Sequence, residues 1–219
     1  MKARMADAKT VAVQAISTAL FTNNSLLPNA SQVINGLQQS YDDGTNVNSY
    51  GGISRTASPF WKSTLISGAG AVLTRSIQLS YLVQCTALNG GEAPDFVVMS
   101  PSDWTTLMQD FLALERFNQT PQSRFGKDDS VNAGFRGLML GDTPYFLDPF
   151  CPKGTEFLIN TKYFAAYVSE DAPFAFSGFF SAIPNLQVAN IGVVIIAMQT
   201  VCAKPISGMQ VTGITGGAF

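Results

Sequence analysis

Few side chains in this chain could carry catalysis, because the sequence contains no histidine. A Ser–His–Asp triad, a Cys–His pair and imidazole metal ligands are therefore excluded. The clearest candidates for acid–base chemistry are two adjacent pairs of carboxylates, Asp42-Asp43 and Asp128-Asp129. Neighbours on an extended chain point to opposite sides, so neither pair presents two carboxylates to one substrate. We interpret both pairs as charges of solvated loops.

The three cysteines are Cys85, Cys151 and Cys202. They lie far apart in the sequence and form no C-x-x-C pair, which argues against zinc binding and redox work. Cys151 also has no histidine to activate it as a nucleophile. We expect all three to be buried small hydrophobic residues of a chain kept in a reducing compartment.

The polar, glycine-rich stretch at residues 41–52 has some features of a calcium-binding loop. Asp42, Asp43, Asn46 and Asn48 could supply oxygen ligands. An EF-hand loop also needs a closing glutamate, and none occurs before Glu92. We therefore expect a surface loop here and no metal site.

Glycine motifs that cradle phosphates are missing too. The sequence has neither a P-loop nor a G-x-S-x-G elbow, and Gly68-Ala69-Gly70 supplies only two of the three glycines of the dinucleotide fingerprint. Asp142 and Asp148 flank a predicted hairpin and are expected to form turns. We predict no catalytic residue and no cofactor. A histidine-free, carboxylate-dependent enzyme stays as an alternative that would need a cleft with two convergent carboxylates of perturbed pKa.

Composition points to a surface buried against partners. The chain has 219 residues, 13 basic and 15 acidic, so its net charge is −2, and only 13% of its residues are charged. An ordinary soluble domain carries about 25% charged residues. The longest apolar run, residues 193–198, is far shorter than the roughly 20 residues of a membrane span, and no secretory segment follows Met1. We expect a cytoplasmic chain that has no membrane partner and, with a net charge of −2, no polybasic patch for nucleic acid.

Hydrophobic spacing and capping signals predict the helices. The N-terminal helix, residues 5–21, carries a stripe of mostly small residues. The best-signalled helix opens with Ser100 as its N-cap, Pro101 at the first position and Asp103 completing a capping-box-like pair. The other two predicted helices are residues 29–40 and 70–88.

The second half of the chain is predicted to be rich in strands, which follow an early strand at residues 95–100. Phe174, Phe176 and Phe180 alternate on one strand face. A loop is expected over residues 115–134. The remaining strands are a hairpin of 135–140 and 143–147, then 155–159, and one or two strands within 187–202. The expected fold class is α+β, with helices concentrated early and strands late.

Several segments in order carry a family resemblance. They are Leu37 with Asp42-Asp43-Gly44, Gly51-Gly52-Ile53-Ser54-Arg55, Pro59-Phe60-Trp61, residues 94–101 (PDFVVMSP) with Trp104, residues 134–137 (GFRG) with Asp148 and Gly154, and residues 157–163 (FLINTKY). Their order and spacing resemble those of a group of tailed-bacteriophage major capsid proteins. The resemblance spans about residues 12 to 214.

The resemblance implies the tailed-phage major capsid fold, which encapsulin nanocompartments share. It has a spine helix, a β-rich peripheral (P) domain and an axial (A) domain. It places the spine helix and part of the P domain in residues 1–69, the A domain in 70–183, and C-terminal strands that return to the P domain in 184–219. The N-terminal arm and extended loop of the family are expected to be absent, as in a truncated chain or a prophage remnant.

The function that the resemblance implies is structural. The chain is expected to be a non-enzymatic major head protein that assembles with copies of itself into an icosahedral shell around double-stranded DNA. Scaffold, portal and decoration proteins are further expected partners, with DNA held by weak, non-specific contact. The expected location is the virion, assembled in the cytoplasm of a bacterial host. An encapsulin-like compartment subunit is the alternative.

Overall fold

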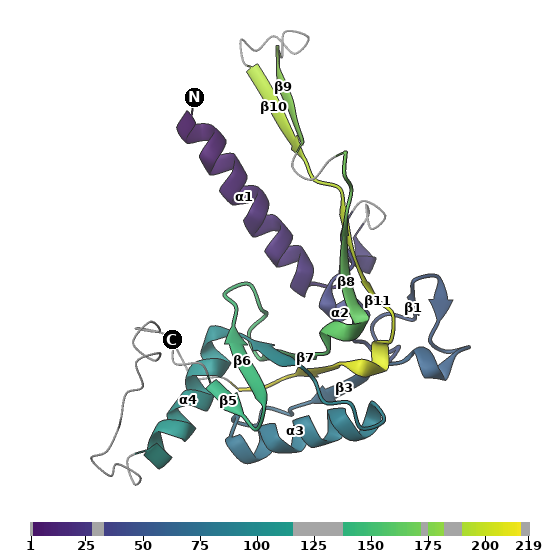
Figure 1. Ribbon diagram of the computed structural model, residues 1–219, viewed down its shortest axis with the longest axis vertical. Helices are drawn as coiled ribbons and strands as arrows, with labels where there is room; N and C mark the ends of the chain where they lie inside the picture. The colour runs from purple at the N-terminus through teal and green to yellow at the C-terminus, as the bar shows by residue number, and fades with distance from the viewer. Residues whose placement is uncertain (1, 28–32, 116–137, 172–174, 182–189, 216–219) are drawn as a thin grey trace.

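A six-stranded mixed sheet forms the centre of the body in the computed structural model, which describes residues 2–27, 33–115, 138–171, 175–181 and 190–215 (Figure 1). The order across the sheet is β3 (Thr64–Ser67), β12 (Met209–Thr212), β7 (Thr155–Ile159), β4 (Phe96–Met99), β6 (Thr143–Leu147) and β5 (Leu138–Leu140). The pairs β12–β3 and β4–β6 are parallel and the other pairs are antiparallel. Segments far apart in the sequence therefore meet in this sheet.

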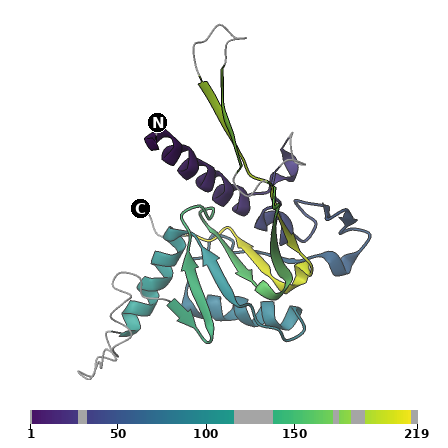
Figure 2. The same cartoon turned by 45° about the horizontal axis from the view of Figure 1, so that its top comes forward.

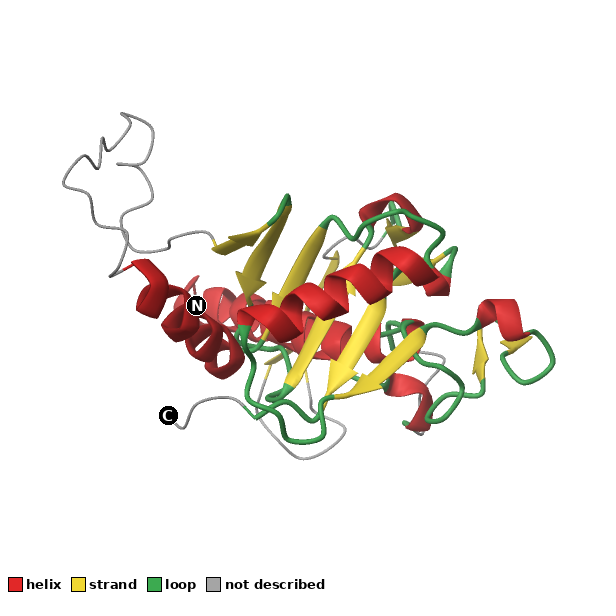
Figure 3. Cartoon of the chain, turned by 90° about the horizontal axis from the view of Figure 1, so that it is seen from below, coloured by secondary structure: helices red, strands yellow, loops and turns green. Residues whose placement is uncertain are grey.

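Helices α3 (Arg75–Leu88) and α4 (Pro101–Glu115) cover one face of the sheet, and α3 lies across its strands in Figure 3. Alternate strand residues point toward these helices, as the two-residue period of a strand requires. This first core contains Val97, Met99 and Leu158 of the sheet, Leu82 of α3 and Leu107 of α4, all of them buried.

The opposite face is covered by the end of α1 (Lys2–Phe21), by α2 (Leu37–Ser40) and by the segment that follows α2. Phe157 and Ile159 of β7 point to this second core. The ring centroids of Phe21 and Phe157 are 5.8 Å apart. This contact joins the C-terminal end of α1 to the middle of the sheet.

Two elements project from the body (Figures 1 and 2). One is α1, and the other is a long antiparallel ribbon in which β8 (Phe164–Val168) pairs with β11 (Met198–Cys202) and β9 (Ala175–Ser181) with β10 (Asn190–Ile195). The register shifts between Gly192 and Val194, opposite Gly178, whose φ is +76°. Glycine suits that left-handed conformation, and the irregularity is a β-bulge.

Shorter elements complete the chain. A small hairpin of β1 (Ser49–Tyr50) and β2 (Ile53–Ser54) stands at the edge of the body. The 3₁₀ turns are η1 (Asn24–Leu26), η3 (Pro59–Trp61), η5 (Thr161–Tyr163) and η7 (Pro205–Ser207).

Many of the predicted elements are confirmed. Helix α4 begins as expected, because the Asp103 amide donates to Ser100 Oγ over 3.3 Å and Ser100 Oγ donates to Asp103 Oδ2 over 2.6 Å. Strands β4 and β7, the hairpin β5–β6 and the two strands β10 and β11 also lie where the sequence placed them. The long N-terminal helix is present as α1.

Two predicted helices were too long. The helix expected over residues 29–40 is confined, within the described residues, to Leu37–Ser40. Gly36 precedes it and lies so close to α1 that an added Cβ would be 1.8 Å from the Thr22 carbonyl oxygen. The helix expected to start at residue 70 starts at Arg75, because Thr74 is its N-cap and Val72 forms a parallel bridge with Thr215.

Other expectations fall partly outside the described residues. The loop at 115–134 lies almost entirely there, as do Asp128, Asp129 and Phe174. Strands also begin earlier in the chain than expected, since β1, β2 and β3 precede α3. The large sheet takes strands from all three predicted segments, 1–69, 70–183 and 184–219. Those domain bounds stay a prediction.

We expect Phe157→Ala to lower the free energy of unfolding by about 3–5 kcal/mol, because it removes a fully buried ring that both anchors α1 and fills the second core. Chemical denaturation followed by circular dichroism measures the change. Phe60→Ala is the matched control: Phe60 is 71% exposed, so its loss should cost less than about 1 kcal/mol. Equal effects of the two substitutions would contradict this packing.

Candidate interaction surface

The buried carboxylate of Asp42 stabilises the loop that follows it through hydrogen bonds to the loop backbone. Its Oδ1 accepts hydrogen bonds from the amides of Gly44 (2.7 Å), Asn46 (3.3 Å) and Val47 (3.1 Å), and its Oδ2 accepts one from Asn46 Nδ2 (2.8 Å). The expectation of a solvated carboxylate was therefore wrong for Asp42, which is buried. The loop's own N–H groups replace water around its charge. Asp43 remains half-buried and accepts from the Thr45 amide.

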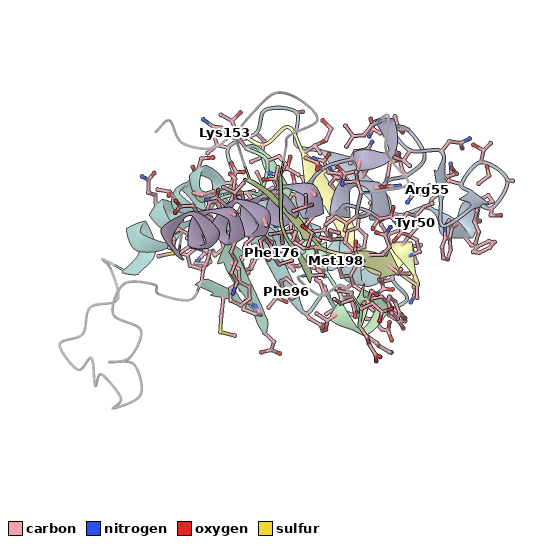
Figure 4. The ribbon with its side chains drawn as sticks, turned by 90° about the horizontal axis from the view of Figure 1, so that it is seen from above. Tyr50, Arg55, Phe96, Lys153, Phe176 and Met198 are labelled. Carbon is pink, nitrogen blue, oxygen red and sulfur yellow. The ribbon has the colours of Figure 1, made fainter. Side chains whose placement is uncertain are left out.

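Arg55 holds the same segment, and its guanidinium is fully buried. Burial lowers the pKa of Arg55, while the nearby charge of Asp42 opposes that shift. Tyr50 lies under the guanidinium, 5.5 Å from ring centroid to Cζ, as the labelled pair in Figure 4 shows. The guanidinium donates to four backbone carbonyls, those of Val47 (2.8 Å), Gln39 (2.9 Å), Ser40 (2.9 Å) and Trp61 (3.3 Å).

This geometry explains part of the segment that carried the family resemblance. Arg55 and Trp61 are structural, since Trp61 Nε1 also donates to the Tyr50 carbonyl over 2.9 Å. Ile53 and Phe60 of the same segment are exposed on its outer side. The expectation of a surface loop at 41–52 is therefore only partly right, because Tyr41, Val47 and Tyr50 are buried.

Replacing Arg55 by Met should lower the free energy of unfolding by about 3–5 kcal/mol, because buried carbonyls of three chain segments lose their donor. Limited proteolysis should then cut within residues 41–62. Lys62→Met is the control, since Lys62 is exposed and a surface substitution is expected to change stability by about 0.5 kcal/mol or less. Resistance of the Arg55→Met protein to proteolysis would contradict this role.

The cysteines are buried, as the sequence indicated. Burial raises the pKa of the Cys85 thiol to about 11 and raises the pKa of Cys151 and Cys202 as well. The thiols are therefore protonated near neutral pH and poor nucleophiles. Within the part of the chain that the structure describes, no three His, Cys, Asp or Glu side chains form a group that could hold a metal ion.

Two carboxylates do come together, and sequence reasoning did not pair them. Asp103, at the start of α4, and Glu156, in β7, are both fully buried, and the charge of Asp103 acts on Glu156. The Asp103 Oδ2 also accepts the Gly154 amide over 3.0 Å. A glutamate inside the apolar strand sequence T-E-F-L-I was the available signal. Two hollows, of about 560 and 550 Å³, are lined by other residues, so neither gives a substrate access to this pair.

The shortage of charge is concentrated in two long stretches of the sequence. Residues 10–41 and 172–203 contain no Asp, Glu, Lys or Arg. The first stretch includes most of α1 and the second includes β9, β10 and β11. Helix α1 and the ribbon strands β9 and β10 project from the body beside one another (Figure 1), whereas α2 of the first stretch packs on the sheet. We call α1 together with the β8–β11 ribbon the projecting surface.

Apolar side chains are exposed on the projecting surface. It carries nine of the eighteen exposed large hydrophobic residues of the described chain: Val11, Val13, Tyr167, Val168, Phe176, Val193, Val194, Ile195 and Val201. Extended apolar surface of this kind marks an interaction site.

No protein-family model matches the sequence, and no curated protein matches it. Solved structures do match. The capsid of cyanophage A-1(L) superposes with a TM-score of 0.72 and 18% identity over 98% of this chain and 69% of that one. The holo-SrpI encapsulin complex of Synechococcus elongatus PCC 7942 gives 0.61 and 8% identity, over 98% and 67%. The capsid of an empty GTA particle gives 0.53 and 12% identity, over 98% and 67%.

These similarities establish the fold. The chain has the architecture of phage capsid and encapsulin subunits, which confirms the fold that the sequence resemblance implied. About a third of each of these subunits has no counterpart in this chain. Among the helices that the structure describes, none is long and apolar enough to cross a membrane.

Proposed function

We propose that this chain is a structural subunit that assembles with copies of itself into a capsid shell. The observation that carries the proposal is the projecting surface, which exposes apolar side chains on a capsid-type fold. Its strands β8–β11 and the part of α1 from Thr10 to Phe21 contain no charged residue. Free monomers rarely keep such a surface open to water. When identical subunits pack against one another through this surface, every copy buries its exposed apolar side chains. In a closed symmetric assembly no subunit is left with this surface open to water.

We assign the two projecting elements to the peripheral part of the subunit and the six-stranded sheet with α3 and α4 to the axial part. The support is that the sheet has covered faces and its own cores, whereas α1 and the ribbon extend away from it. This assignment keeps the spine helix of the sequence-based prediction in α1. It moves β3 and β12 from the peripheral to the axial part, and β8 and β9 from the axial to the peripheral part.

The content of the proposed shell is double-stranded DNA, held without a dense basic patch. The net charge of −2 favours containment over tight binding, because tight binding to phosphates needs clustered Lys and Arg. Scaffold, portal and decoration proteins are proposed as further partners. The proposed location is the virion, after assembly in the cytoplasm of a bacterial host.

An encapsulin-like shell that holds a protein cargo is the second candidate, and the match to the SrpI encapsulin subunit favours it. The two shells differ in content. Particles purified from the native host and treated with nuclease should release protected DNA if the first proposal holds. Particles that contain a stoichiometric second protein and no protected DNA would favour the encapsulin-like shell.

A substitution in the β8–β11 ribbon tests whether the projecting surface mediates assembly. We expect the wild-type protein to form rings, sheets or shells in negative-stain electron microscopy and light scattering. Ile195→Glu places a charge on the projecting surface, where Ile195 is 50% exposed, and should shift the protein at least tenfold toward monomer, because burying an unpaired charge opposes association.

The matched control is Val83→Glu, at a 59% exposed position on the outer side of α3. It should assemble like the wild type. Circular dichroism of all three proteins verifies folding. A wild-type protein that stays monomeric at every concentration, or an Ile195→Glu protein that assembles normally, would contradict the role of this surface.

A further inference from the structure

Glu156 is a buried carboxyl group that the proposed shell function does not use. It is the second residue of β7 and is paired with Met99 of β4 on one side and Val211 of β12 on the other. Its side chain lies on the face of the sheet that α3 and α4 cover, and it is fully buried. Water therefore cannot stabilise a charge on it.

The contact between Glu156 and α3 is a single hydrogen bond. Gln78 Nε2, from α3, donates to Glu156 Oε2 over 2.5 Å. The Oε1 atom of the same Gln78 amide accepts a hydrogen bond from the Tyr145 hydroxyl over 3.2 Å. Glu156 Oε1 has no hydrogen-bond partner among the described residues. One neutral amide is too little to hold an ionised carboxylate in an apolar core.

Among the titratable groups around Glu156, Asp103 of α4 opposes its ionisation. The others are Tyr81 of α3, Tyr145 of β6 and Cys151 of the turn before β7, and a charge on Glu156 raises the pKa of each of them. None of these is a cation. Lys153 acts on Asp103, and no ion pair between described residues includes Glu156.

Burial is the main cause of the resulting shift, which raises the pKa of Glu156 to about 8; the charge of Asp103 adds to the rise and the Gln78 hydrogen bond opposes it. Burial also raises the pKa of Asp103 itself.

We propose that Glu156 keeps its proton while α3 is docked on the sheet, and that loss of this proton releases α3. Gln78 connects the protonation of Glu156 to the position of α3, because this fully buried residue of α3 donates a hydrogen bond to the Glu156 carboxyl group of β7. Ionisation would leave a charge under the helix with one donor and no counter-ion. Movement of α3 away from the sheet that it crosses in Figure 3 would let water reach that charge.

The sign of the pH dependence follows from proton binding. When α3 is released, Glu156 meets water and its pKa returns to the ordinary 4.5. Between this value and about 8 the docked state binds a proton that the released state does not. Docking therefore weakens as pH rises, by about tenfold per pH unit, and becomes independent of pH above about 8.

Hydrogen–deuterium exchange on the full chain, in whatever assembly state it adopts, measures this. We expect the protection of the amides of α3, corrected for intrinsic exchange, to fall about tenfold per pH unit between pH 5.5 and 7.5. Glu156→Gln mimics the protonated acid and should make that protection nearly constant. Glu156→Leu replaces the carboxyl group with an apolar side chain that cannot titrate, so it should also make the protection of α3 nearly independent of pH.

The control is Glu92→Gln. Glu92 is a half-buried acid whose pKa is lowered to about 2 by hydrogen bonds from Lys162 and Tyr163, so it does not titrate in this range. This protein should keep the wild-type slope. A wild-type slope of zero overturns the proposal. An unchanged slope in the Glu156 variants also overturns it, because the titrating group would then be another one, such as Asp103.

Discussion

The burial of strand β7 on both faces is the constraint on which the rest of the structure depends. Phe157 and Ile159 join the core under α1 and α2, while Leu158 belongs to the core under α3 and α4. β7 also lies between β12 and β4, so it connects the last strand of the chain to a strand from its first half. The origin of both projecting elements follows from it: α1 ends against Phe157, and the ribbon starts a few residues after Ile159.

Polar chemistry in this molecule is used inside the body. Asp42, Arg55 and Asp103 are buried, and each satisfies backbone groups of a loop or a helix start. They stabilise the parts of the body whose backbone would otherwise lack partners. On the projecting surface, the strands β8–β11 and the part of α1 after Lys9 contain no charged residue. The low share of charged residues in the chain therefore comes from these uncharged stretches, whereas the body uses buried charges to stabilise its loops and helix starts.

Local signals predicted the elements whose causes are local. The Ser100–Asp103 cap, the Gly141 turn between β5 and β6 and the apolar run of β7 are each encoded within a few residues. Features set by distant segments could not be found this way. The start of α3 depends on a bridge from Val72 to Thr215, and the buried state of Arg55 depends on carbonyls up to 16 residues away. From the sequence, the fold could be predicted only from the order of the short motifs along the chain. Overall similarity gives little signal, because the identity to the capsid of cyanophage A-1(L) is 18%.

The ribbon has a kinetic consequence. β8 and β11, and likewise β9 and β10, form two-stranded sheets in the described chain, so each outer edge presents unpaired backbone donors and acceptors. Such edges pair with any extended chain, correct or not. Productive contact and irregular stacking therefore compete for the same hydrogen bonds, and they differ in how they depend on time and concentration. A slow supply of subunits favours the ordered product, whereas rapid overproduction favours tangled aggregates built from the same strands.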